Sequence, residues 1–284
     1  MSQGLSLHIG LNLVDPNHYG GWDGKLNACE ADAEDMQRIA DAAGYTSHIC
    51  LTKAATRSAV KDALNDASGA LSAGDIFFLT YSGHGGQIPD RDGDERDLMD
   101  ETWCLYDGEW LDDETRDILA SFAEGVRVLV LSDSCHSGTV VKFAAYSTLA
   151  RSGGIRGIYS EVDRESPPVY RVMPPDVALR TYRLNRDFYT KLGKAVAGRK
   201  MPPEMKASVR LISGCQDNQL SMDGTFNGLF TGTLLQVWSD GAFDGNYREF
   251  HRAILDRMPP TQSPNHFMMG IPDADYDGQK PFTI

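Results

Sequence analysis

The 284-residue sequence lacks long hydrophobic runs and closely spaced cysteines. No apolar stretch approaches the roughly 18–20 residues of a membrane-spanning helix. The N-terminus has neither a basic region nor a small-residue cleavage site, so we expect it to begin a strand rather than a signal peptide. The cysteines form no CxxC motif, which argues against a disulfide framework, a zinc site and a dithiol redox protein and favours the reduced cytoplasm. They are Cys29, Cys50, Cys104, Cys135 and Cys215.

Basic residues are few relative to acidic ones. The chain has 27 Lys and Arg against 40 Asp and Glu, which gives a formal net charge of -13. A nucleic acid or an acidic membrane surface would call for a basic surface, so we expect neither as a partner. The acidic balance fits a basic ligand or a bound cation.

Apolar, β-prone segments alternate with segments of helical periodicity along most of the chain. The predicted strands are 5–14, 47–51, 75–81, 126–131, 208–213 and 265–269. The predicted helices are 28–43, 56–70, 112–123, 185–197, 229–238 and 247–258. This alternation predicts an α/β domain with a mostly parallel sheet, in which ligands bind beyond the carboxyl ends of the strands.

Two segments interrupt the alternation. Residues 89–113 are predicted to form an acidic loop. Residues 140–203 contain three Pro-Pro pairs, one Gly-Gly pair and many basic residues, and are predicted to form a long, partly mobile connection.

Two short motifs carry the chemistry. YSGHGG at 81–86 follows a buried strand and places His84 where the chain leaves the sheet. DSCHSG at 133–138 follows the next strand and surrounds Cys135 with polar residues. Taken by itself, the first motif is equally typical of a loop histidine without a role, and the second of a cysteine that serves as a small buried apolar residue. Together, at two strand ends of one sheet, they fit a cysteine nucleophile and its histidine partner. The histidine lies about 50 residues before the cysteine, as in caspases.

The motifs resemble those of metacaspases and their bacterial relatives, the orthocaspases. The resemblance extends to NACEADA at 27–33, ISGCQDNQ at 212–219 and FNGLFT at 226–231. It implies a three-layer αβα caspase-like fold in one domain. Within it, residues 1–140 correspond to the large subunit, 141–203 to a connection and 204–284 to the small subunit. The resemblance also favours a monomer.

A cysteine peptidase mechanism assigns roles to these residues. Cys135 attacks the scissile carbonyl as a thiolate, and His84 protonates the leaving amine and then activates water. The backbone N–H groups of Cys135 and Gly85 are the expected oxyanion donors.

The expected specificity is for a basic P1 residue. Residues two apart on a strand point to the same side, so Asp133 faces the same cleft as Cys135. A carboxylate there suits a cationic side chain, although Asp133 also reads as a helix cap. In metacaspases, which cut after Arg or Lys, the resemblance places Asp133 at the pocket floor and adds Asp32, Ser82 and Cys29.

The same resemblance raises the question of calcium. Asp100, Asp112 and Asp113 match three acids of the calcium site of metacaspases, while the fourth position is Lys142, which opposes a cation. Asp112 and Asp113 also suit the start of a helix, where acids are favoured without a metal. Calcium dependence therefore stays open.

Self-processing and rival functions also stay open. The 140–203 segment offers eight basic residues at which an Arg- or Lys-specific peptidase could cut itself. They are Lys142, Arg151, Arg156, Arg164, Arg171, Arg180, Arg183 and Lys194. The alternatives are a non-catalytic caspase-like interaction module and a caspase-like peptidase with another P1 preference, such as Asn or Asp. The intact residues His84, Cys135 and Asp133 disfavour both.

Overall fold

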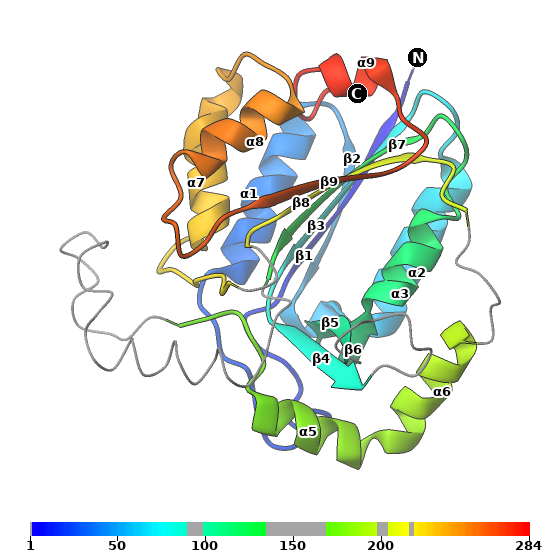
Figure 1. Cartoon of the computed structure of the whole chain (residues 1–284), viewed down its shortest axis with the longest axis vertical. Coiled ribbons are helices and arrows are strands. Elements are labelled where there is room, and N and C mark those ends of the chain that lie inside the picture. Colours follow the sequence, from blue (N-terminus) through cyan, green and yellow to red (C-terminus); the bar gives the residue numbers. More distant parts are fainter. Residues whose placement is uncertain (1, 90–98, 135–168, 198–203, 216–218) are drawn as a thin grey trace.

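The computed structural model describes residues 2–89, 99–134, 169–197, 204–215 and 219–284. These form three layers, with helices on both faces of a six-stranded sheet (Figure 1). The expected three-layer α/β class with a mostly parallel sheet is confirmed. In the described part of the chain, none of the helices is both long enough and apolar enough to cross a membrane.

The central sheet has the strand order β2-β1-β3-β7-β8-β9. Its first five strands in this order are parallel, and β9 is antiparallel to β8. The strands are β1 (Gly4–Gly10), β2 (Thr46–Leu51), β3 (Ile76–Ser82), β7 (Arg127–Asp133), β8 (Ser208–Ser213) and β9 (Asn265–Gly270). The middle strand β3 is buried throughout, as its continuous apolar run predicts.

Each face of the sheet has its own apolar core and its own helices (Figure 1). One face packs against α1, α7 and α8, through side chains such as Ile39, Leu234 and Phe250. The other packs against α2 and α3, through side chains such as Leu64 and Ile118. The helices are α1 (Cys29–Ala42), α2 (Arg57–Ala70), α3 (Asp112–Leu119), α7 (Leu229–Trp238), α8 (Tyr247–Leu255) and the short α9 (Ala274–Gly278). Single turns of 3-10 helix are η1 (Thr52–Ala54) and η3 (Ser239–Gly241).

The prediction of an acidic loop over 89–113 is wrong for its described part. An antiparallel sheet forms there from β4 (Gly85–Pro89), β5 (Met99–Leu105) and β6 (Gly108–Leu111). The segment contains aromatic residues as well as acids, and its tryptophans are buried. Trp103 stacks on Tyr81 with ring centroids 4.5 Å apart, which ties this sheet to the main core.

The described part of the 140–203 segment is also more ordered than predicted. It contains α5 (Pro175–Leu184) and α6 (Arg186–Ala197), of which the sequence predicts only the second. Val177 packs with Val14 and Tyr19, so α5 is anchored on the loop that follows β1. Residues 140–168 and 198–203, the remainder of the predicted mobile connection, lie outside the described residues.

The register of the parallel strands sets the position of the site. Gly10 pairs with Ser82, and Ser82 pairs with Asp133, so the carboxyl ends of three neighbouring strands are level. The first turn of α1 begins beside this edge. Polar side chains from separate parts of the sequence are thereby gathered at one place.

Candidate active site

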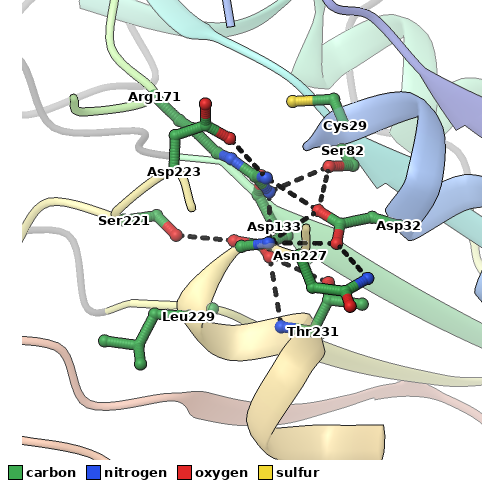
Figure 2. Close-up of polar contacts among 12 residues, drawn as sticks. Cys29, Asp32, Ser82, Asp133, Arg171, Ser221, Asp223, Asn227, Leu229 and Thr231 are labelled. Atoms are coloured by element: carbon green, nitrogen blue, oxygen red, sulfur yellow. Dashed lines mark hydrogen bonds and ion pairs between the residues drawn. The ribbon is translucent and has the colours of Figure 1, made fainter. Parts of the chain in front are cut away.

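Three of the predicted pocket residues lie together at this edge of the sheet (Figure 2). Ser82 ends β3, Asp133 ends β7, and Asp32 lies in the first turn of α1. The hydroxyl of Ser82 donates to Asp32 Oδ2 over 2.8 Å. All three side chains are buried. Two buried carboxylates so near each other require a cation.

That cation is Arg171, which comes from the connecting segment and is completely buried. Its Nη2 lies 2.7 Å from Asp32 Oδ2, and its Nη1 lies 2.9 Å from Asp133 Oδ2. Nη1 also donates to the Ser82 hydroxyl over 2.8 Å. The acidic pocket thus holds a guanidinium group, recognised on both of its outer nitrogens.

A third carboxylate, not assigned a role from the sequence, completes the pocket. Asp223 Oδ1 lies 3.0 Å from Arg171 Nη2, and its other oxygen accepts from the backbone N–H of Asn27 over 2.8 Å. Asp223 lies just before the FNGLFT motif, in a stretch without regular structure. Its proximity to Asp32 depends on the path of the chain rather than on a local pattern, so no signal in the sequence pointed to it.

Neighbouring donors fix the two predicted acids. Gly228 N and Asn227 Nδ2 each donate to Asp32 Oδ1 over 3.0 Å. Asp133 accepts from Ser221 Oγ at 2.5 Å and from the hydroxyl of Thr231 at 2.8 Å. Burial raises the pKa of Asp32, and the Arg171 guanidinium opposes that rise. These donors hold both carboxylates in place for a cation.

His84 lies between β3 and β4 and is buried against the ring of Trp22, with centroids 4.7 Å apart. Its Nε2 lies 2.9 Å from the carbonyl oxygen of Gly24. Because a carbonyl only accepts, Nε2 carries the proton of the neutral ring and Nδ1 keeps its lone pair. Nδ1 has no hydrogen-bond partner within the described part of the chain. This nitrogen is therefore the one left for proton transfer.

The electrostatics of His84 favour the neutral ring. The pKa of the ring is lowered to about 4, mainly by burial and to a smaller extent by the Arg171 charge, while the backbone of Gly24 and Val172 and the Asp223 charge oppose the shift. At neutral pH the ring is a proton acceptor. The influence of the Val172 carbonyl also shows that the histidine lies beside the backbone that follows Arg171.

The backbone N–H of Gly85, one of the two predicted oxyanion donors, is engaged. It donates to the carbonyl oxygen of Arg171 over 3.0 Å. Two residues later, Met173 N donates back to Gly85 O over 2.8 Å. A Cβ at the next position, Gly86, would stand 2.6 Å from Met173 Cε, so the glycine pair lets this chain approach closely.

The remaining predicted pocket residue, Cys29, is buried at the start of α1. Burial raises the pKa of its thiol, against the effects of Arg171 and the Ser82 hydroxyl, so it stays protonated at neutral pH. Cys29 therefore lines the pocket as a small uncharged group. The predicted nucleophile, Cys135, lies outside the described residues, as does Lys142.

The three acids matched to a calcium site lie away from this pocket. Asp100 is buried in β5, Asp112 is exposed at the start of α3, and Asp113 forms an ion pair with Arg116 on the same helix. Over the described residues, no three Asp, Glu, His or Cys side chains are grouped as a metal site.

Comparison with known proteins places the site in context. Residues 12–274 match the model of the caspase domain family. Metacaspase-1 of Saccharomyces cerevisiae is 32% identical over 262 residues, and the match covers 81% of this chain and 56% of the relative. Metacaspase-1 of Schizosaccharomyces pombe is 30% identical over 253 residues, and the match covers 81% of this chain and 57% of the relative. The chain thus spans just over half the length of these relatives. The crystal structure of protein GSU0716 from Geobacter sulfurreducens is 55% identical, covers 99% of both chains and superposes with a TM-score of 0.88.

Proposed function

Because this chain belongs to the caspase domain family, we propose that it is a cysteine endopeptidase that cleaves proteins or peptides after arginine or lysine. The single observation that carries the P1 preference is the buried guanidinium of Arg171 among Asp32, Asp133 and Asp223. A pocket built around three carboxylates stabilises a cationic side chain and repels an acidic one.

In the proposed mechanism, the role of Cys135 rests on its sequence motif, and the roles of His84 and Gly85 rest on their positions in the structure. The thiolate of Cys135 attacks the P1 carbonyl carbon, and the N–H of Gly85 stabilises the oxyanion. His84 Nδ1, which has no hydrogen-bond partner among the residues that the structure describes, takes the thiol proton and delivers it to the leaving amine, while the Gly24 carbonyl orients the ring. Water then hydrolyses the thioester, with His84 accepting its proton.

The test is a set of fluorogenic peptides that differ only in P1, as Arg, Lys, Asp or Asn. The wild-type protein is expected to hydrolyse the Arg and Lys peptides, and Cys135→Ala is expected to hydrolyse none. Cleavage after Asp or Asn in preference to Arg would overturn the proposed specificity. No thiol-dependent hydrolysis of any peptide would favour the non-catalytic module instead.

The same assay decides the calcium dependence. We propose calcium as an activator that acts through Asp100, Asp112 and Asp113, which requires Asp113 to leave its ion pair with Arg116. Addition of calcium to the chelator-treated protein is then expected to raise the rate in wild type and less so in Asp112→Asn. Equal rates with calcium and with chelator would contradict it.

We also propose that the peptidase acts as a cytoplasmic monomer. Light scattering of the purified chain tests the first part, and a mass near twice the 31.2 kDa of one chain would contradict it. Fractionation of the source cells tests the second part.

A further inference from the structure

We propose that the buried carboxyl group of Glu109 is a positioning group for catalysis. It holds the Gly85–Gly86 backbone, which carries the proposed oxyanion donor, and it joins that backbone to helix α6 of the connecting segment. This inference rests on the proposed function. It adds to that function a residue outside the P1 pocket on which the rate of catalysis depends.

Glu109 lies in β6, and its side chain is completely buried. Thr102 Oγ1, on the neighbouring strand β5, donates to Glu109 Oε2 over 2.7 Å. The other carboxyl oxygen, Oε1, has no hydrogen-bond partner among the residues that the structure describes. A buried carboxylate needs a compensating charge or several donors, whereas a protonated carboxyl group does not. The surroundings of Glu109 therefore suit the protonated form.

The carboxyl group of Glu109 lies directly against the backbone of β4. A Cβ on Gly86 would stand 2.8 Å from Glu109 Oε2 and 2.9 Å from Thr102 Oγ1, closer than real Cβ atoms approach their neighbours. Gly86 pairs with Thr102 in the small sheet, and Gly85 is the preceding residue of β4. Because the interior is closely packed, a shift of the carboxyl group moves this backbone and with it the N–H of Gly85.

Glu109 also contacts α6, through Tyr189. The N–H of Glu109 donates to the Tyr189 hydroxyl oxygen over 3.3 Å, and the same hydroxyl lies 2.7 Å from His18 Nε2. The ring of Tyr189 is buried and packs with Ile88 of β4 and Leu111 of β6. The helix is thus attached to both outer strands of the small sheet, at the residue whose carboxyl group meets β4.

The charged groups near Glu109 leave its carboxyl group without a counter-ion. Arg57 of α2 donates to the main-chain carbonyl of Glu109, but its Nη2 binds both carboxylate oxygens of Glu114 on α3, over 2.7 and 2.9 Å. Within the described part of the chain, Glu109 itself forms no ion pair. The other titratable groups around this site are Tyr19, Cys104, Tyr189, His18 and Asp107.

None of these other groups supplies a positive charge at neutral pH. Burial raises the pKa of Tyr19, Cys104 and Tyr189 and lowers that of His18, so all four are neutral. Asp107, in the turn between β5 and β6, is exposed and negative. The cluster therefore favours a proton on Glu109.

The proton links the packing at Glu109 to pH. Burial raises the pKa of Glu109 to about 7, against the hydrogen bonds of Thr102 and Tyr189 and the Arg57 charge. The packed arrangement binds this proton more tightly than an opened one does, so a rise in pH weakens it. Above pH 7 most molecules carry a buried charge beside Gly86, and the catalytic arrangement is expected to be lost.

Hydrolysis of an Arg fluorogenic peptide at pH 6 and pH 8 tests the proposal. Glu109→Gln keeps the shape of the protonated carboxyl group and does not ionise. The ratio of its kcat to that of wild type is expected to rise about tenfold from pH 6 to pH 8, because a group with a pKa near 7 loses most of its proton over this range. The ratio cancels the titration of Cys135 and His84. Glu124→Gln, at an exposed glutamate, is the matched control and is expected to give the same ratio at both pH values.

Tyr189→Phe tests the link to α6. The substitution removes a hydroxyl group that lowers the pKa of Glu109. The pH at which wild-type kcat falls to half is therefore expected to move upward in Tyr189→Phe. A purely structural role of the tyrosine would lower the rate at every pH and leave this midpoint in place.

Infrared spectra of the Cys135→Ala chain follow Glu109 without any hydrolysis. The band of a buried protonated carboxyl group is expected at pH 6, weaker at pH 8, and absent when Glu109→Gln is added.

The outcomes separate the two proposals. A Glu109→Gln ratio that does not change with pH overturns the positioning role and leaves the peptidase in place. Absence of the carboxyl band at pH 6 also overturns it, even if Glu109→Gln fails to fold, and an unmoved midpoint in Tyr189→Phe overturns the link to α6. Absence of thiol-dependent hydrolysis at both pH values, with the band present, overturns the proposed function and with it the role of Glu109 in catalysis.

Discussion

Gly228 lies directly against the guanidinium of Arg171. A Cβ on this glycine would stand 2.6 Å from the Cζ, Nη1 and Nη2 atoms of the arginine, closer than real Cβ atoms approach their neighbours. The backbone of Gly228, with φ -59° and ψ 155°, is open to any residue. The glycine is therefore required by what the pocket contains and not by the turn of the chain.

This contact makes Gly228→Ala a test of the pocket. The added methyl group occupies the position of the P1 guanidinium, so kcat/KM for an Arg peptide is expected to fall by about 100-fold, equivalent to about 2.7 kcal/mol. The matched control is Gly232→Ala on α7, where a Cβ meets only Asn227 Cβ at 3.5 Å. Wild-type kinetics in Gly228→Ala would contradict the assignment of the pocket.

The two-sided recognition of Arg171 predicts a preference for arginine over lysine. Nη1 contacts Ser82 and Asp133 while Nη2 contacts Asp32 and Asp223, a fork that a single ammonium group does not reproduce. For peptides that differ only at P1, kcat/KM is expected to be about tenfold higher with Arg, or about 1.4 kcal/mol.

Asp223→Asn tests the third carboxylate in the same pair of peptides. The substitution removes one charge beside Nη2 but keeps an oxygen for the N–H of Asn27. We expect the Arg peptide to lose about tenfold in kcat/KM, about 1.4 kcal/mol, and the Lys peptide to lose less. An unchanged Arg-to-Lys ratio would remove Asp223 from the pocket.

Local patterns in the sequence were sufficient to predict the sheet and the convergence of three pocket residues. Continuous apolar runs located β3 and β7, and the end of each strand placed Ser82 and Asp133 at one edge. The small sheet β4-β5-β6 was missed because its acids suggested a loop, whereas stacking of Trp103 on Tyr81 holds it in place.

Local sequence patterns did not predict that Arg171 and Asp223 lie in the pocket. Arg171 is one of several basic residues in the connecting segment, and only the tertiary fold shows that this arginine lies in the pocket. Its backbone pairs with Ser221 and its side chain with Asp223, and both contacts join positions about 50 residues apart, which no local pattern encodes. Asp223 was missed for the same reason.

Buried histidines predict a loss of stability in acid. Burial lowers the pKa of His8 to about 3 and that of His84 to about 4, against about 6.5 in the unfolded chain. Between these values the unfolded chain binds protons that the folded chain does not, so the free energy of unfolding falls as the pH falls. From pH 7 to pH 5 each histidine contributes a loss of about 1.8 kcal/mol.

Urea denaturation of the uncut Cys135→Ala chain at pH 7 and pH 5 measures this loss. His8→Gln in the same background is expected to lose less stability between the two pH values, since its share of the proton uptake is gone. An identical pH dependence in both chains would show that His8 titrates normally when folded.

The central claim, a Cys135 nucleophile beside a pocket for arginine, is tested most directly with an irreversible peptidyl ketone probe that carries Arg at P1. Peptide mapping of the processed wild-type protein is expected to find one adduct, on Cys135, with labelling at least 100-fold slower for the matched probe carrying Asp. Labelling of another cysteine, or equal rates with the two probes, would contradict the account.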